Sequence, residues 1–141
     1  MDNLHNKAVI NLMLTGNYVV ENINSFLKVY DLTVQQFNIL RILRGQDGLP
    51  INLYELQDHM IHKMSNTTRL VEKLRKKELL ERKVCESNRR KIEILITDKG
   101  LGLLAGIDQS LIDFEKNLVH QLSREEIVKL LELLNKVKIK S

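Results

Sequence analysis

Apolar residues recur at steps of three and four along most of this chain, which is the repeat of an amphipathic α-helix. The first such stretch predicts a long helix between residues 8 and 30. Its apolar positions are Leu12, Val19, Ile23, Phe26, Leu27 and Tyr30. Five more helices are predicted at about residues 33–43, 52–60, 65–77, 98–119 and 123–137.

Residues that favour helix starts stand at the beginning of these stretches. In a capping box, the residue before the helix accepts a hydrogen bond from the third helical residue, whose side chain bonds back to the cap. This pattern occurs at Thr33–Gln36, Asn52–Glu55 and Ser123–Glu126. Ser65 and Thr97 are predicted to cap the helices that follow them.

The repeat changes from helical to alternating after the fourth predicted helix. Isoleucines alternate with other residues in Lys91–Thr97, which predicts a half-buried strand. Its predicted partner is Leu80–Glu86, and the connection is Ser87–Arg90. The two arginines of this connection would lie at the tip of a hairpin, where they must stay solvated or meet a partner.

Composition changes this picture little. The chain has 141 residues, 43% apolar and 28% charged, with one proline and six glycines, which is typical of one mostly helical soluble domain. Its single cysteine excludes a disulfide framework and favours a reducing compartment. The longest apolar run, Leu101–Ile107, is too short for a membrane span. We therefore expect a cytoplasmic protein with no membrane segment and no signal peptide.

The distribution of charge is more informative than its sum of +4. Between Lys63 and Lys91 the chain has eleven basic and four acidic residues, a net charge of +7, so the remainder carries −3. A concentrated basic segment favours binding to a polyanion such as nucleic acid. A solvated helix face is the alternative interpretation, and charge alone does not separate the two.

Three short helices followed by a hairpin predict a winged helix-turn-helix, which is a mainly α (α+β) fold with a two-stranded wing. In this motif the second helix of the pair enters the major groove of DNA and the wing reaches the backbone or minor groove. The run Ser65–Arg69 supplies small hydrogen-bonding residues and an arginine at the start of that helix, where they can contact bases or phosphates. Arg89 and Arg90 would lie over the adjacent minor groove.

Four runs in this order and spacing resemble the core pattern of the MarR family of homodimeric bacterial winged-helix regulators. They are Leu70–Leu74, Leu79–Arg82, Asn88–Arg90 and Thr97–Gly100. The specific part covers about residues 33–100, and the flanking helices match in length and order. By position, the resemblance assigns Lys73 to the recognition helix and makes Arg90 the wing-tip arginine. The complete predicted DNA-contacting set is Ser65, Asn66, Thr67, Thr68, Arg69, Lys73, Arg89, Arg90 and Lys91.

The chain departs from the family pattern at two positions. Asn88 replaces the usual aspartate of the wing, which removes a charge and the arginine contact that it would make. Glu78 replaces the glycine that usually ends the recognition helix. A non-glycine residue in a left-handed cap costs about 1 kcal/mol, so either the helix continues further or the turn is strained.

The outer helices are longer than a minimal winged helix needs. The chain is predicted to be one domain, residues 1–141, with 33–100 as its DNA-binding lobe and 1–30 and 101–141 as dimerisation helices. The resemblance implies this use of the first and last helices. A two-fold dimer would present two recognition helices to a pseudo-palindrome about one DNA turn apart. The alternative is a larger monomer whose terminal helices fold back.

Some isolated residues suggest other chemistry. His59 and His62 lie three residues apart near acidic side chains, but two histidines without further ligands favour surface or capping roles over a metal site. Cys85 has basic neighbours that would favour its thiolate, although a non-reactive cysteine is the simpler interpretation. Gly102 and Gly106 lie one turn apart, and they would either admit a close helix or be tolerated weak points.

An enzyme is not expected, because the chain has no phosphate-binding glycine loop, nucleophile elbow or spaced set of catalytic side chains. No cofactor is predicted. The predicted function is a homodimeric DNA-binding transcriptional regulator that binds double-stranded DNA at a pseudo-palindromic operator. Repression, with release by a small-molecule effector, is implied by the resemblance. The alternative is a winged-helix module that docks a protein partner and does not read DNA.

Overall fold

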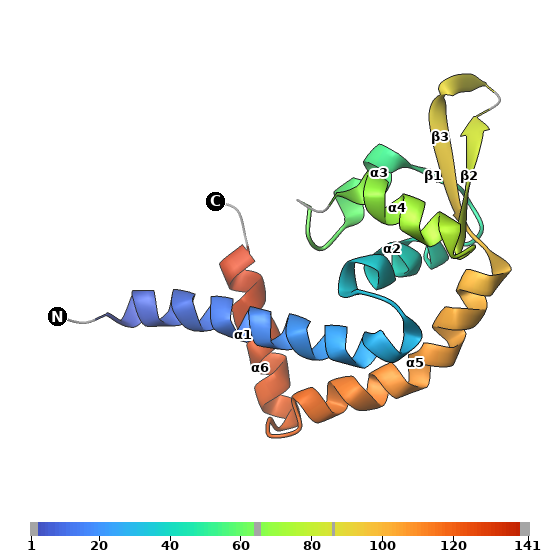
Figure 1. Ribbon diagram of the computed structural model, residues 1–141. Helices are drawn as coiled ribbons and strands as arrows, with labels where there is room; N and C mark the ends of the chain where they lie inside the picture. The colour runs from blue at the N-terminus through green and yellow to red at the C-terminus, as the bar shows by residue number, and fades with distance from the viewer. Residues whose placement is uncertain (1–2, 64–65, 86, 139–141) are drawn as a thin grey trace. The chain divides into compact units, whose positions relative to one another are not determined.

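A computed structural model of the chain describes residues 3–63, 66–85 and 87–138 (Figure 1). The chain forms two compact units, residues 1–107 and 108–141. The described elements are α1 (Leu4–Leu27), the 3-10 helix η1 (Lys28–Tyr30), α2 (Val34–Arg44), β1 (Ile51–Asn52), α3 (Leu53–His59), α4 (Thr67–Lys76), β2 (Leu80–Cys85), β3 (Asn88–Ile96), α5 (Asp98–Leu118) and α6 (Arg124–Lys138). Among the described residues, we find no helix with the length and hydropathy required to cross a bilayer.

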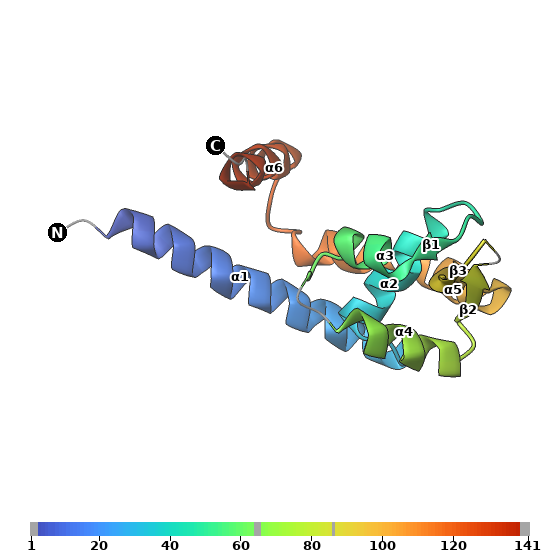
Figure 2. The same ribbon diagram turned by 90° about the horizontal axis from the view of Figure 1, so that it is seen from above.

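The first helix starts earlier and ends earlier than its hydrophobic pattern predicts. The predicted range was 8–30, whereas α1 covers Leu4–Leu27 and tightens into η1 over its last turn. Asp31 ends η1 in a left-handed conformation, with φ of 56°. Leu27 is the one buried residue of α1, and in both views the N-terminal half of α1 extends past α2, α3 and α4 (Figures 1 and 2).

The start of α2 confirms the predicted capping box. The Thr33 hydroxyl accepts a hydrogen bond from the Gln36 amide, and the Gln36 side chain accepts one from the Thr33 amide, both at 3.1 Å. A third bond comes from α1, where the Asn24 side chain accepts from the Val34 amide at 2.8 Å. These bonds satisfy amides at the helix start that would otherwise lack partners, and they tie α1 to α2.

The start of α3 keeps half of the predicted capping box. The Asn52 side chain accepts from the Glu55 amide at 2.8 Å. The return bond is different, because the Asn52 amide group donates to the Glu55 carboxylate at 2.7 Å. The backbone of Ile51 and Asn52 instead forms β1, which pairs with Ile94 and Glu93 of β3. The predicted two-stranded hairpin is confirmed as β2 and β3, but β1 was not predicted, and the sheet has three antiparallel strands in the order β1-β3-β2.

The start of α4 differs from the prediction by one residue. Ser65 was predicted as the cap, but it lies outside the described residues. The cap is Asn66, whose side chain accepts a hydrogen bond from the Arg69 amide at 3.1 Å. The buried face of the helix is formed by Thr67, Val71 and Leu74.

The end of α4 is a Schellman turn built on a non-glycine residue. The amides of Leu79 and Glu78 donate to the carbonyl oxygens of Leu74 and Arg75, at 3.1 and 2.9 Å, which is the bond pattern of this motif. Glu78 has φ of 63°. Of the two predicted alternatives, the structure shows the strained turn, in which the helix stops and Glu78 adopts the left-handed conformation.

The hairpin begins regularly at its base and becomes irregular near its tip. Leu80 pairs with Ile96 and Val84 with Ile92, but Cys85 pairs with Asn88, so the register shifts between Val84 and Cys85. The predicted connection Ser87–Arg90 is therefore partly wrong, since β3 already begins at Asn88. Residues 89–91 lie between the paired positions as an insertion in β3. Glu86 lies outside the described residues.

The first turn of α5 packs tightly against the end of α4. Thr97 acts as the predicted cap, because its hydroxyl accepts from the Gly100 amide at 3.0 Å. The same hydroxyl donates to the Glu78 carbonyl oxygen at 2.7 Å. A Cβ on Gly100 would stand 2.3 Å from the Leu79 carbonyl oxygen, a separation that no side chain tolerates. Glycine at this position therefore allows two backbones to approach closely.

The core of the first unit lies between α2, α3, α4, the sheet and the start of α5. Its fully buried side chains include Ile39, Leu40, Leu56, Leu74, Ile94, Leu104 and Ile107. In the second unit, Ser123 and Glu126 form the predicted capping box at the start of α6, with bonds of 2.9 and 3.2 Å. No side chain of α6 is buried over its range Arg124–Lys138.

Candidate nucleic-acid interface

The outward face of α4 exposes polar and basic side chains. Thr68, Arg69 and Lys73 are all exposed. Within the described residues, neither the Arg69 guanidinium nor the Lys73 ammonium forms a hydrogen bond or an ion pair. Their charges are therefore available for a ligand outside the chain.

The start of α4 divides the predicted contact residues into two groups. Asn66 is exposed, but its side-chain oxygen already caps the helix. Thr67 is 2% exposed and faces the interior, so its prediction as a DNA-contacting residue is wrong. The reason is helix phase, because Thr67 lies on the same face of α4 as the buried Val71 and Leu74. Ser65 lies outside the described residues.

The hairpin brings its basic run to the irregular end of the sheet. Lys91 is exposed. The backbone of Asn88–Arg90 belongs to β3, whereas the side chains of these residues, and that of Cys85, lie outside what the structure describes. The inserted residues 89–91 interrupt the pairing of β3 with β2. Such bulges re-aim side chains and increase strand twist.

An ion cluster connects α4 to the hairpin. Arg75 donates two hydrogen bonds to the Glu72 carboxylate, at 3.0 and 2.6 Å, and an Arg82 nitrogen lies 3.5 Å from the same carboxylate. The hydrogen bond from Arg75 holds the pKa of Glu72 below its ordinary value, and it raises that of Arg75. The cluster occupies the side of α4 that faces β2.

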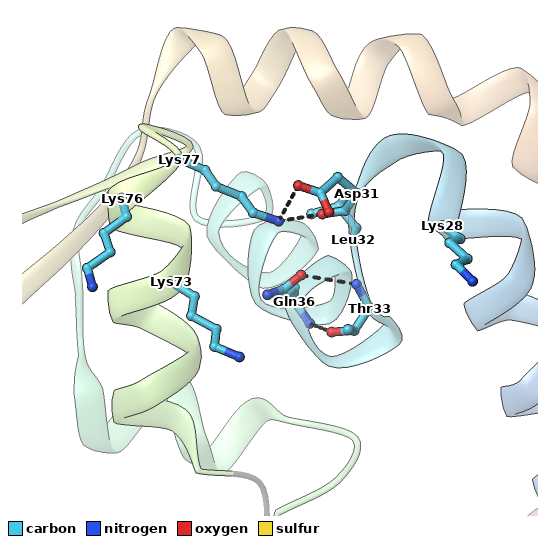
Figure 3. Close-up of a pocket in the computed structure, with 8 residues that line it drawn as sticks. All are labelled: Lys28, Asp31, Leu32, Thr33, Gln36, Lys73, Lys76 and Lys77. Atoms are coloured by element: carbon cyan, nitrogen blue, oxygen red, sulfur yellow. Dashed lines mark hydrogen bonds and ion pairs between the residues drawn. The ribbon is translucent and has the colours of Figure 1, made fainter.

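The opposite side of α4 borders a groove that the sequence did not indicate. This groove has a volume of about 500 Å³ and lies between η1, the start of α2 and the C-terminal half of α4 (Figure 3). Four of its residues are lysines, namely Lys28, Lys73, Lys76 and Lys77. Only Lys73 among them was predicted to contact DNA. Lys28 lies far from the basic segment in sequence, so only the tertiary fold brings it to this place.

His59, Gly102 and Gly106, which suggested other roles, have ordinary surroundings. His59 Nδ1 lies 2.8 Å from the Glu55 carbonyl oxygen, one turn earlier in α3. Among the residues that the structure describes, no three His, Cys, Asp or Glu side chains come together as a metal site. Among the described residues, a Cβ on Gly102 or Gly106 would meet nothing within 4 Å, so neither glycine serves a close helix contact there.

Comparison with known proteins places this arrangement in a family. A model of the MarR family matches residues 32–92, from the residue before the α2 cap into β3. Over 131 residues the chain is 29% identical to the HTH-type transcriptional regulator MhqR of Bacillus subtilis, and this match covers 93% of the chain and 89% of MhqR. The winged-helix segment of the chain, residues 32–92, therefore matches the MarR family, and nearly the whole chain is similar to a transcriptional regulator.

Two solved structures, one of them a MarR, share the fold over nearly the whole chain. A mutant MarR from E. coli, complexed with operator DNA, superposes with a TM-score of 0.86 at 22% identity, covering 97% of both chains. BpsR of Bordetella bronchiseptica, whose DNA binding is regulated by 6-hydroxynicotinic acid, superposes with a TM-score of 0.83 at 20% identity, covering 94% of this chain and 99% of BpsR. The winged helix and the long terminal helices are thus both features of the MarR-family fold.

Proposed function

We propose that this protein is a homodimeric transcriptional regulator of the MarR family that binds a pseudo-palindromic operator in double-stranded DNA. The observation that carries the proposal is the exposed face of α4, on which Thr68, Arg69 and Lys73 stand without partners in the described chain. A helix of this kind fits the major groove, where arginine can bond a guanine edge through two nitrogens. The family's solved complex with operator DNA supports this docking mode.

The wing completes the proposed interface. Lys91 and the inserted residues at positions 89 and 90 lie at the end of the hairpin, where basic side chains can reach the sugar-phosphate backbone or the minor groove. Asn66 stays in the proposed contact set through its exposed position at the helix start. Ser65 stays in it on sequence grounds, and Thr67 does not.

The terminal helices supply the proposed dimer interface. Large apolar side chains of α1 remain exposed, among them Val9, Met13 and Tyr18 at 55%, 65% and 59%. Leu131 and Val137 of α6 are likewise 57% and 65% exposed. Large exposed apolar side chains on both terminal helices are typical of a protein–protein interface. In this proposal, residues 1–30 and 101–141 form the dimerisation part and residues 33–100 the DNA-binding lobe.

Repression and release by a small molecule complete the proposal. A protein bound at an operator blocks access to a promoter, and a ligand releases it by binding more tightly to a conformation that fits DNA less well. The regulation of BpsR by 6-hydroxynicotinic acid shows this type of control in a protein with the same fold.

Selection of bound fragments from random or genomic DNA tests the function directly. We expect a pseudo-palindromic motif whose half-sites lie about one helical turn apart, and binding that weakens steeply as salt increases. Selection of no DNA, or affinity for a protein partner that hardly changes with salt, would favour the protein-docking alternative.

Arg69→Ala tests the docking mode. We expect binding to weaken by about 1–3 kcal/mol, with relaxed preference at one base pair, because a bidentate contact to a base is lost. Arg124→Ala, which removes the same charge from exposed α6, is the matched control and should bind as wild type does. Unchanged base preference in Arg69→Ala would contradict the proposed orientation of α4.

A further inference from the structure

The groove beside α4 has an unusual charge balance. Its lining contains four lysines and one aspartate, Asp31. Lys77 forms an ion pair with the Asp31 carboxylate at 3.2 Å and also donates to the Asp31 carbonyl oxygen (Figure 3). The one acidic group of the groove is therefore already neutralised by the lysine above it.

The other three lysines have no such partner. Lys28, Lys73 and Lys76 are exposed, and within the described residues their ammonium groups form no hydrogen bond and no ion pair. They come from two different elements, η1 and α4, so the fold holds like charges around one hollow. Such an arrangement costs repulsion unless an anion occupies the site.

The floor of the groove is formed by the start of α2. Leu32 and Gln36 are 4% and 6% exposed there, and Lys73 extends toward the Thr33–Gln36 capping box (Figure 3). The amides of Thr33 and Gln36 are already bonded to side chains. An anion in this groove is consequently recognised by ammonium groups, and such charge-based recognition depends strongly on salt.

The position of the groove on α4 indicates which anion it takes. Residues seven apart lie on one line of a helix, so Lys76 follows Arg69, and Lys73 lies between this line and α2. The Glu72–Arg75–Arg82 cluster occupies the other side of α4. A helix in the major groove lies between two phosphate backbones, so its two sides face different strands.

We propose that the lysine groove, formed by Lys28, Lys73, Lys76 and the Lys77–Asp31 pair, is a phosphate-binding site. The phosphate comes either from the DNA strand on the side of α4 away from the hairpin or from a small phosphate-bearing molecule that competes with that strand. The first source rests on the proposed function, whereas the groove itself does not. Lys28 and Lys76 thereby become ligand-binding residues.

The DNA source is tested with Lys28→Gln and Lys76→Gln in the full chain. Each variant should lower the slope of log affinity against log salt by about 0.9, the value for one lost phosphate contact. When salt is raised from 50 to 200 mM, the DNA affinity of such a variant should therefore fall by a factor about threefold smaller than that of wild type. The weakening should be equal on operator and unrelated DNA. Lys7→Gln removes the charge of an exposed lysine near the N-terminal end of α1. It should keep the wild-type slope when sedimentation shows that the variant has the wild-type mass.

The small-molecule source is tested with pyrophosphate by calorimetry and by displacement of bound DNA. Binding to wild type that is weakened at least tenfold in Lys28→Gln, together with displacement of DNA, assigns the groove to a competing phosphate-bearing molecule. A changed salt slope without pyrophosphate binding assigns it to the DNA backbone. If the protein binds pyrophosphate but no DNA, the proposed function is contradicted, whereas the phosphate-binding site in the lysine groove is supported. Unchanged salt slopes without pyrophosphate binding would contradict the assignment of the lysine groove as a phosphate-binding site, and would leave the proposed function unaffected.

Discussion

Helices α1 and α2 differ in how far their apolar residues are buried. Five of the eleven residues of α2 are buried, including Phe37, Ile39 and Leu40. Only Leu27 is buried among the 24 residues of α1, whereas Met13 and Leu14 are 65% and 60% exposed. The apolar face of α2 is therefore buried inside its own chain, whereas most apolar side chains of α1 remain exposed.

This difference shows that one hydrophobic repeat serves two purposes. Both helices have apolar residues at three- and four-residue steps, but those of α2 meet α4 and β3, whereas the N-terminal half of α1 extends beyond these elements (Figure 2). Burial of apolar surface stabilises by about 25 cal/mol per Å². In α2 this contribution stabilises the fold, and in α1 we expect it to stabilise association.

The largest expected effect is on stability, and it tests the buried face of α2. Leu40→Ala should lower the free energy of unfolding by about 2–5 kcal/mol, because it opens a cavity around a fully buried side chain. Urea titration at fixed protein concentration measures this change. Leu49→Ala, at a position 69% exposed, should stay within about 0.5 kcal/mol of wild type. Equal midpoints for both variants would contradict the core assignment.

The second effect tests the surface of α1. Met13→Glu should weaken dimerisation by about 2–4 kcal/mol, since it places a charge in a desolvated interface. Equilibrium sedimentation should give about twice the chain mass of 16.4 kDa for wild type and a lower mass for the variant at micromolar concentration.

A matched control keeps this test specific. Asn11→Asp adds the same charge about 160° around the same helix, at an exposed polar position, and should leave the mass unchanged. A wild-type mass near 16.4 kDa would contradict the role of α1 in association, because the protein would then be a monomer whose α1 exposes its apolar residues to solvent.

A smaller effect locates strain within the first unit. Glu78→Gly should raise the free energy of unfolding by about 1 kcal/mol, because glycine adopts the left-handed conformation without the steric cost of a Cβ. Glu78→Ala removes the side chain but retains that Cβ, and should give no comparable gain. Equal stability of the Gly and Ala variants would show that the turn is not strained.

The smallest effect is a pH dependence at Glu72. Its folded-state pKa is lowered, first by the hydrogen bond from Arg75, so its contribution is complete above the unfolded glutamate pKa of about 4.3 and is lost as pH falls through the lower folded value. The difference in unfolding free energy between wild type and Glu72→Gln should therefore shrink from pH 7 to pH 3. In an Arg75→Gln background this pH dependence should become weaker, and an unchanged dependence would contradict the assigned cause.

Local rules predicted the helix order and most helix starts. The capping boxes at Thr33 and Ser123 depend on residues three positions apart, so the sequence contains all the information that they need. The strand β1 was missed because its two residues, Ile51 and Asn52, are too few to show a repeat, and it forms only by pairing with β3.

The site was harder to predict because it depends on phase and on tertiary placement. Thr67 precedes the buried Val71 by one turn and the buried Leu74 by two, so the helical repeat already indicated its burial, and only its place in the first turn made it look like a contact residue. Basic residues at the hairpin tip resembled a loop, since a charged run has no alternating pattern that would indicate a strand. Lys28 joins the lysine groove through the packing of η1 beside α4, which no local pattern reports.

The junction at Thr97 connects the turn after the C-terminal end of α4 to the first turn of α5. Its hydroxyl bonds both the carbonyl of Glu78 and the amide of Gly100, and the close approach at Gly100 leaves no room for one backbone to slide past the other. We therefore expect a displacement of the first turn of α5 to displace the end of α4 as well, and with it the exposed face that contains Arg69 and Lys73.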